Sequence, residues 1–240
     1  MSGLRRIGIL QPDAVLEQFR GEFGDYPAML ADVLNQAANP GECLEYTAYD
    51  VMRGEYPAEL GECDAYVITG SRASVYDEES WIQRLEDYVR VLHAARHKLV
   101  GICFGHQMVA RALGGATEAA TVGWGVGIAE SAVVNPGDFM QPALKRFNLL
   151  VSHRDQVVRL PEGAIVRAGS GFCPISIFTV GRHILALQGH PEFVAEYSKV
   201  LMNMRRDLLG EPVWANGVAS LEAANDRATV ARWILNFIFG

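Results

Sequence analysis

Cysteine is scarce in this sequence, and no two cysteines stand close together. Among 240 residues there are four, at positions 43, 63, 103 and 173, without a CxxC pair. This usage argues against a disulfide framework and is typical of a protein of the reducing cytoplasm. The first segment, MSGLRRIGILQP, leads directly into a strand-like run rather than into the apolar region of a secretory signal, which indicates the same location.

Long apolar runs and a surplus of basic residues are also lacking. Arg, Glu, Asp or Gly interrupts every hydrophobic stretch before it reaches the ~20 residues that a membrane-spanning helix needs. Lys and Arg number 21 against 28 Asp and Glu, which leaves a formal net charge of −7. This balance argues against a protein that binds nucleic acid or anionic membranes, because both functions require a basic surface.

The sequence contains no phosphate-binding GxxxxGK loop and no cluster with metal-ligand spacing, so we expect no cofactor and no metal. His93 and His97 stand four apart on a charged helical segment, but no third ligand accompanies them, and we interpret them as part of a solvated face. Repeats, low-complexity tracts and Ser/Pro linkers are absent as well. Residues 1–240 are therefore expected to form a single domain.

Apolar residues are abundant, and in the first half they alternate regularly between two patterns. They make up 50% of the chain, which is enough for a large core. Runs rich in β-branched and aromatic residues alternate with segments whose apolar residues recur at helical spacing. The runs cover 6–11, 45–51, 65–70 and 98–104, each interpreted as a strand buried on both faces, and the helical segments cover 27–37 and 79–97. This alternation predicts a parallel sheet with helical crossovers.

The second half has a different pattern, in which strand-like runs follow one another with little helix between them. These runs cover 123–134, 147–153, 163–170, 173–181 and 183–190, and two helices close the chain near 193–208 and 220–238. The runs indicate antiparallel or mixed strands added to a parallel core. The predicted class is therefore α/β, with a mostly parallel central sheet and an antiparallel or mixed extension.

The segment 98–115, KLVGICFGHQMVARALGG, carries the most specific signal. A strand-like run passes through GICFG into a helical segment that a glycine pair stops. This pattern is typical of a nucleophile elbow, in which the reactive side chain sits on a strained strand-to-helix turn and the glycines leave room for the backbone. The helix start favours a thiolate at Cys103. Cys43, Cys63 and Cys173 lack this context, and we interpret them as small buried hydrophobic residues.

A cysteine nucleophile needs a base and a group that orients the base. The run 183–190 ends at Gly189-His190-Pro191-Glu192. Side chains two apart on extended backbone point the same way, so Glu192 can reach the imidazole of His190, fix its tautomer and stabilise the imidazolium. A lone His-Pro-Glu turn would be interpreted as structural. Together with Cys103 it completes a Cys-His-Glu set.

The segments GICFGHQ and GHPEF together resemble the class I glutamine amidotransferase family, which uses a Cys-His-Glu triad on a flavodoxin-like core. VITGSRASV at 67–75 and VSHRDQV at 151–157 resemble two further segments of that family, in the expected order along the chain. The resemblance implies a flavodoxin-like three-layer fold. It also implies that Cys103 is the nucleophile, His190 the base and Glu192 the orienting carboxylate.

The resemblance implies the rest of the site as well. The backbone N–H groups of Gly70 and Phe104 would form the oxyanion hole, and Gln107 would line the glutamine pocket. The backbone of Ser152 and His153 would contact the amino-acid end of the substrate. A loop held by hydrogen bonds of Asp155 is an equally good interpretation of these last two residues.

Two departures from the family pattern bear on the substrate. The loop Thr69-Gly70-Ser71-Arg72 stands where many relatives have two glycines and a proline, but its central glycine keeps the backbone donor. Gly189 stands where many members have an aromatic residue, and we expect it to leave room beside the triad. Both departures resemble the branch similar to the amidotransferase part of GMP synthetase, which includes γ-glutamyl peptidases.

Three functions follow as hypotheses, each with a small-molecule ligand. The first is a glutamine amidotransferase that hydrolyses the glutamine side-chain amide through a γ-glutamyl thioester and releases glutamate and ammonia, the latter for a separate synthase subunit. The second is a free-standing γ-glutamyl peptidase acting on larger γ-glutamyl conjugates, for which the room at Gly189 would be suitable. The third is a non-catalytic regulatory or binding module, which the complete triad disfavours.

Overall fold

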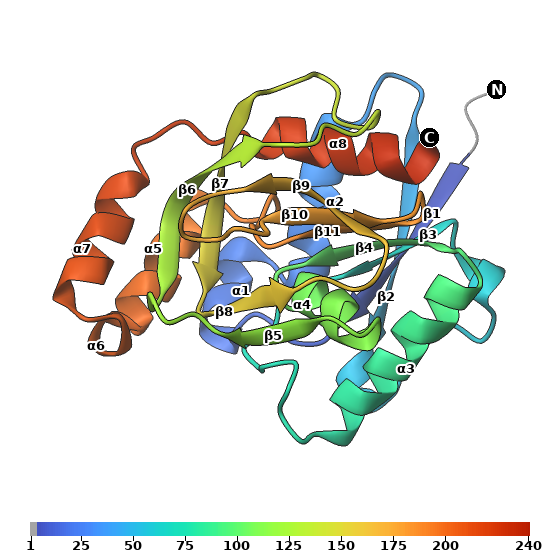
Figure 1. Ribbon diagram of the computed structural model, residues 1–240, viewed down its shortest axis with the longest axis horizontal. Helices are drawn as coiled ribbons and strands as arrows, with labels where there is room; N and C mark the ends of the chain where they lie inside the picture. Colours follow the sequence, from blue (N-terminus) through green and yellow to red (C-terminus); the bar gives the residue numbers. More distant parts are fainter. Residues whose placement is uncertain (1–3) are drawn as a thin grey trace.

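A nine-stranded sheet organises residues 4–240, the part of the chain that this computed structural model describes (Figure 1). Neighbouring strands are parallel along the order β2-β1-β3-β4-β11, and β10, β9, β6 and β7 continue the sheet in antiparallel pairs. The parallel strands are β2 (Cys43–Asp50), β1 (Leu4–Gln11), β3 (Ala65–Ile68), β4 (Lys98–Ile102) and β11 (Ile184–Leu187). The antiparallel strands are β10 (Ile177–Val180), β9 (Ala164–Gly169), β6 (Gly125–Val133) and β7 (Arg146–His153). The order 2-1-3-4 followed by one more parallel strand is the flavodoxin-like arrangement, which confirms the predicted fold class.

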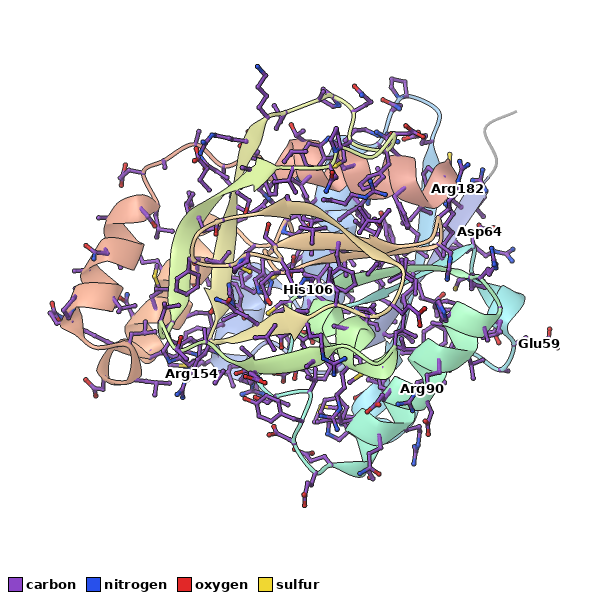
Figure 2. All side chains as sticks on the ribbon, in the orientation of Figure 1. Glu59, Asp64, Arg90, His106, Arg154 and Arg182 are labelled. Carbon is purple, nitrogen blue, oxygen red and sulfur yellow. The ribbon has the colours of Figure 1, made fainter. Side chains whose placement is uncertain are left out.

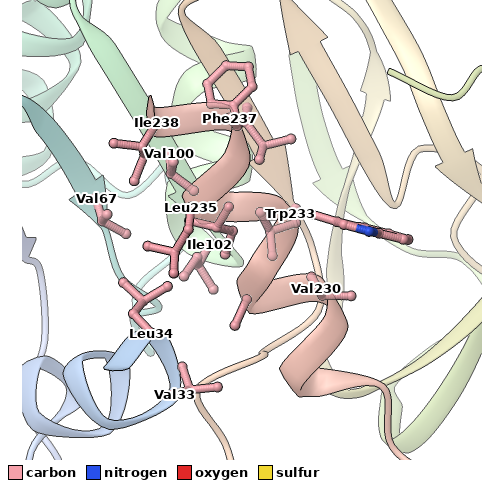
Figure 3. Close-up of a cluster of buried hydrophobic side chains, with 14 of the residues drawn as sticks. Val33, Leu34, Val67, Val100, Ile102, Val230, Trp233, Leu235, Phe237 and Ile238 are labelled. Carbon is pink, nitrogen blue, oxygen red and sulfur yellow. The ribbon is translucent and has the colours of Figure 1, made fainter. Parts of the chain in front are cut away.

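Helices cover both faces of the parallel strands and complete three layers (Figure 1). α2 (Tyr26–Ala37) and α8 (Arg227–Phe239) pack on one face, and α3 (Ser80–Ala94) and α4 (Phe104–Ala112) pack on the other. Figure 3 shows side chains of α8, among them Leu235 and Ile238, gathered near Val100 and Ile102 of β4, whereas Trp233 extends to the other side of the helix. Burying these apolar stripes on both sides of the sheet supplies most of the driving force for folding.

The remaining elements are a small sheet and several short helices. A second, two-stranded antiparallel sheet pairs β5 (Ala116–Ala119) with β8 (Asp155–Arg159). The short helices are α1 (Glu17–Phe23), η1 (Val51–Arg53), η2 (Leu60–Glu62), α5 (Ala195–Met204), α6 (Arg206–Leu209) and α7 (Glu211–Ser220). Within residues 4–240, no helix is both long and apolar enough to cross a lipid bilayer.

The structure corrects several details of the sequence-based expectations. Cys63 and Cys173 are buried as expected, but Cys43 is exposed on β2 and is not a buried hydrophobic residue. β2 is an edge strand with several exposed residues, so it is not buried on both faces. The last helix begins at Arg227 and not near 220, because Asp226 exchanges hydrogen bonds with the backbone of Asn148 and ties the chain to β7 before the helix starts. His93 is not on a solvated face, since its Nδ1 lies 3.0 Å from Nε2 of the buried His183.

Candidate active site

Cys103 occupies the sharp turn between β4 and α4. Its backbone has φ 52° and ψ −100°, a left-handed conformation that is strained for any residue with a side chain. A Cβ on Gly101 would collide with the backbone of Gly105, and a Cβ on Gly105 would lie 2.5 Å from the carbonyl oxygen of Ile68. The two glycines therefore permit the close approach of strand and helix on which the elbow depends.

His190 reaches Cys103 because their strands are neighbours in the sheet. Ile102 of β4 pairs with Leu187 of β11, and the N–H of Cys103 donates to the Leu187 carbonyl at 2.9 Å. Three residues beyond Leu187, the N–H of His190 donates to the carbonyl of Leu150 at 2.8 Å. Both side chains line one cavity, so two segments far apart in sequence meet at the carboxyl edge of the sheet.

Two contacts hold the imidazole of His190, and a third interaction holds the turn that carries it. Its Nδ1 donates to Oε1 of Glu192 at 2.7 Å, as expected for side chains two apart on extended backbone. Its ring stacks on Phe193 with centroids 3.9 Å apart and an interplanar angle of 11°. From α8, Arg227 donates to the carbonyl oxygens of Pro191 and Glu192 at 2.9 and 3.3 Å, which fixes the turn that carries the pair.

The electrostatic surroundings favour a charged His190. Burial by itself lowers the pKa of His190, but the charges of Glu192 and Cys103 outweigh it and raise the pKa to about 10. Glu192 is only 1% exposed, so its attraction to the imidazole acts with little screening by water. An imidazolium next to a thiol is the arrangement that stabilises a thiolate.

Gly70 lies directly against the two residues at the centre of the site. It follows β3 by two residues, and a Cβ built on it would lie 3.0 Å from Cε1 of His190 and 3.7 Å from Cβ of Cys103. Phe104, the first residue of α4, has one of the backbone N–H groups that a helix start leaves without an intrahelical partner. The structure thus brings both proposed oxyanion donors next to Cys103.

Hydrogen bonds tie the loop after Gly70 on both sides. Arg72 donates to Asp13 from Nε and Nη2, and Ser71 Oγ donates to the carbonyl of Pro12 at 3.3 Å. On the other side, Ser74 Oγ and Tyr76 Oη donate to the Asp155 carboxylate at 2.5 and 2.9 Å. The loop is therefore held between the segment after β1 and the start of β8.

Gln107, Ser152 and His153 line the same cavity as Cys103. Nε2 of Gln107 donates to the backbone carbonyl of Asp155 at 2.8 Å and to Oε1 of Gln188 at 3.1 Å. His153 is buried, its Nδ1 lies 3.1 Å from the same carbonyl, and burial lowers its pKa to about 4, so it is neutral at pH 7. The Asp155 carboxylate accepts from Ser74 and Tyr76 of the Gly70 loop, and within residues 152–155 only its backbone carbonyl contacts His153, so the choice between a substrate contact and a structural loop at Ser152 and His153 stays a prediction.

The cavity that joins these residues has a volume of about 300 Å³. Besides the residues described, its walls include Tyr26, Trp124, Arg154, Phe193 and Arg205. In Figure 2 Arg154 lies at the margin of the molecule near the start of β8, whereas His106 lies at its centre. The volume is at the lower end of the range for sites that bind small molecules.

Gly189 does not lie where the sequence suggested. A Cβ on it would meet Cβ and Cδ1 of Leu149 at 3.0 Å, and Gly189 is not among the residues that line the cavity beside Cys103. Successive residues of an extended segment alternate in direction, so with His190 turned to the cavity, Gly189 faces β7 instead. The expectation of extra room beside the triad was therefore wrong.

Sequence reasoning missed three residues that the structure places around the site. Asp13 anchors the Gly70 loop, Arg227 anchors the His-Pro-Glu turn, and Arg205 lines the cavity. Each comes from a segment distant in sequence from the residue it contacts. No local pattern marked them, because an isolated Asp or Arg in a polar context is most often a solvated residue.

Comparison with known proteins finds a matching family and relatives along most of the chain. The family model for glutamine amidotransferase class-I matches residues 41–204. Gamma-glutamyl peptidase 2 of Arabidopsis thaliana is 32% identical over 203 residues, which are 80% of this chain and 78% of that protein. A GMP synthase of Aeropyrum pernix is 26% identical over 81% of this chain but only 36% of its own length.

A solved structure shares the fold. The crystal structure of a glutamine amidotransferase from Thermotoga maritima superimposes with a TM-score of 0.74, at 20% identity, over 98% of this chain and 96% of that chain. The family match covers the elbow, the Gly70 loop and the His-Pro-Glu turn together. The chain belongs to the class I glutamine amidotransferase family, in which its relatives include γ-glutamyl peptidases and the amidotransferase part of GMP synthase.

Proposed function

We propose that this chain hydrolyses the side-chain amide of glutamine through a γ-glutamyl thioester on Cys103, with His190 and Glu192 completing the triad. One observation carries the proposal: a cysteine in strained left-handed backbone faces a cavity beside a buried histidine that is bonded to a buried glutamate. A place on a cavity wall, backbone strain and a charged partner are what a cysteine nucleophile requires, and a structural cysteine needs none of them.

In the first half of the reaction, the Cys103 thiolate attacks the γ-carbonyl carbon, and the proton of the thiol resides on His190. The N–H groups of Gly70 and Phe104 stabilise the negative oxygen of the tetrahedral intermediate. His190 then gives its proton to the leaving nitrogen, the C–N bond breaks, and ammonia departs. Glu192 accepts from Nδ1–H throughout, so that Nε2 is the nitrogen that exchanges the proton.

In the second half, a water molecule attacks the thioester while His190 takes one of its protons. The carbon–sulfur bond breaks, glutamate leaves, and the proton returns to the thiol. Gln107, Ser152 and His153 are proposed to contact the substrate from the opposite wall. The buried, neutral His153 provides shape and a hydrogen-bonding backbone there, and it takes no part in proton transfer.

A γ-glutamyl peptidase is the second candidate, and two observations favour it. The relative named gamma-glutamyl peptidase 2 matches this chain along most of both lengths, and the cavity of about 300 Å³ beside Cys103 leaves space for a leaving group larger than ammonia. The same thioester chemistry applies, with an amine leaving in place of ammonia. In the amidotransferase case, the GMP synthase relative supports a separate synthase as the acceptor of ammonia.

We also propose a cytoplasmic location, with which the four free cysteines are consistent.

The deciding experiment measures kcat/KM of the purified chain for free glutamine and for γ-glutamyl dipeptides. Hydrolysis of either that disappears in Cys103→Ala supports thioester chemistry, and a non-catalytic module would hydrolyse neither. A preference for dipeptides of more than about tenfold, or ~1.4 kcal/mol in transition-state binding, would replace the amidotransferase by the peptidase. Activity that persists in Cys103→Ala would refute both.

A further inference from the structure

Arg205 contributes an unneutralised positive charge to the cavity beside Cys103. It stands between α5 and α6, and its half-buried side chain turns back to line the cavity. Nη1 donates to Ser152 Oγ at 3.1 Å, and the guanidinium carbon lies 5.8 Å from the centre of the Trp124 ring. Among residues 4–240, no carboxylate lies within ion-pairing distance of it.

Two nearby arginines, unlike Arg205, each form an ion pair with a carboxylate. Arg206, the next residue, donates from Nε and Nη2 to the Glu211 carboxylate at 2.9 and 2.8 Å. Arg72, in the same cavity, donates from the same two nitrogens to Asp13 at 2.8 and 2.7 Å. Arg205 places one of its five N–H groups on a neutral hydroxyl instead. The planar guanidinium of Arg205 is half-buried and has no carboxylate partner among the described residues. Such a group is well suited to bind the carboxylate of a ligand with two parallel hydrogen bonds.

A negative counterpart faces the same cavity. Asp155 also lines it, and its carboxylate accepts only from the neutral hydroxyls of Ser74 and Tyr76 within the described residues. Asp155 stands three residues after Ser152, and the Ser152 hydroxyl accepts from Arg205, so Arg205 reaches the β7–β8 corner that carries Asp155. An unneutralised anion and an unneutralised cation at one corner match a zwitterionic amino-acid head group.

We propose that Arg205 binds the α-carboxylate of the substrate, with Asp155 on the side of its α-ammonium, and so determines that the acyl group is an intact γ-glutamyl residue. This inference rests on the function proposed above. The guanidinium fork accounts for the carboxylate, and Trp124 and Ser152 keep it in place before the ligand arrives. A γ-glutamyl peptide has a second carboxylate, at the end of its leaving group, and the experiment must separate the two.

The test is equilibrium binding by calorimetry to the full chain carrying Cys103→Ala, which removes turnover. The probes are L-γ-glutamylglycine, its analogue with the α-carboxylate as a carboxamide, and L-γ-glutamylglycinamide. Adding Arg205→Gln should weaken the first and third by about tenfold or more and leave the second nearly unchanged. The matched control is Arg154→Gln, which removes an exposed arginine from the same cavity and should change each probe less than about threefold.

Four outcomes would overturn the assignment. Equal weakening of all three probes by Arg205→Gln would show a structural role, and equal effects of the two arginine variants would show a general electrostatic field. A loss confined to the probes with a free C-terminal carboxylate would place Arg205 at the leaving group. No binding of any probe to the Cys103→Ala chain would also refute it. Binding without hydrolysis by the unsubstituted chain would instead refute the proposed function and leave Arg205 as the carboxylate site.

Discussion

Arg72 and Asp13 form a two-pronged ion pair at the edge of the cavity beside Cys103. Nε and Nη2 of Arg72 donate to the two carboxylate oxygens of Asp13 at 2.8 and 2.7 Å, and the backbone N–H of Arg72 adds a third bond at 2.9 Å. Asp13 is 6% exposed, so the pair is closed to water on the carboxylate side. Two residues before Arg72 stands Gly70, whose N–H is a proposed oxyanion donor.

Asp13→Asn should lower kcat by at least about tenfold with little change in KM. The variant loses the ionic attraction between residue 13 and Arg72, so the loop that carries Gly70 is held less firmly. A displaced oxyanion donor weakens binding of the transition state more than binding of the substrate. Steady-state kinetics on the better substrate check this. Glu211→Gln is the matched control, because it removes an exposed pair of the same type on Arg206 and should leave kcat unchanged. A rise in KM at constant kcat would contradict the positioning role of Asp13.

Cys103 should react with iodoacetamide faster than Cys43, although accessibility alone predicts the reverse order. Cys43 is exposed on β2, whereas Cys103 is 6% exposed but has a charged His190 beside it to hold a thiolate. Cys63 and Cys173 are buried, and burial raises the pKa of both thiols, that of Cys173 to about 12. Timed labelling near pH 7 with peptide mass mapping gives the order. Faster modification of Cys43 would argue against an activated Cys103.

His190→Ala should reduce kcat/KM far more than Glu192→Gln does. Alanine removes the group that moves the proton, with an expected loss of about a thousandfold or more, whereas glutamine keeps an oxygen that accepts from Nδ1–H and should cost about ten- to a hundredfold. Thermal unfolding of both variants shows whether the turn survives. Equal losses would mean that Glu192 does more than orient the ring, and two unimpaired variants would make the turn purely structural.

The raised pKa of His190 gives its contribution to stability a defined pH dependence. Its pKa is about 10 in the folded chain against the ordinary 6.5. The stabilisation is therefore fully present below about pH 6.5 and is lost as the pH rises toward 10, because the unfolded chain releases the proton first. Urea unfolding of the unsubstituted chain and of His190→Gln at about pH 6, 8 and 10 should give a difference that shrinks with pH.

His153 is a control for that series, because its pKa is shifted in the opposite direction from that of His190. Burial lowers its pKa to about 4, so its contribution is present above about pH 6.5 and is lost as the pH falls toward 4. His153→Gln should therefore change the pH dependence on the acid side only. A difference between the unsubstituted chain and His190→Gln that stays constant between about pH 8 and 10 would show that His190 is neutral in the folded protein at these pH values.

The features that could be predicted from sequence are those encoded within about ten neighbouring residues. The Cys103 elbow needs two glycines and a strand-to-helix change, and the His190–Glu192 contact follows from the direction of alternate residues on one short extended segment. The parallel core was equally visible, because helices at regular spacing separate the first strands. Local geometry was sufficient for each of these predictions.

The features that sequence did not predict depend on which distant segments meet. Gly189 was expected at the cavity, yet it packs against Leu149, and only the position of β7 decides this. The contacts of Arg205 with Ser152 and of Asp13 with Arg72 join residues 53 and 59 positions apart. Such pairings leave no periodic pattern in the local sequence. The sequence around an arginine that anchors a site therefore does not differ from the sequence around a solvated arginine.

The adjacency of β4 and β11 has a consequence for how this chain tolerates change in length. Ile102 is paired with Leu187, so the distance between Cys103 and His190 depends on the lateral spacing of two neighbouring strands and not on the chain that joins them. Insertions or deletions in the connecting turns between residues 120 and 180 leave that spacing intact, while a one-residue slip of β11 would reverse the direction of His190. Changes of length in those turns therefore leave Cys103 and His190 side by side, and the parts of the cavity wall that lie there can change without separating the two residues.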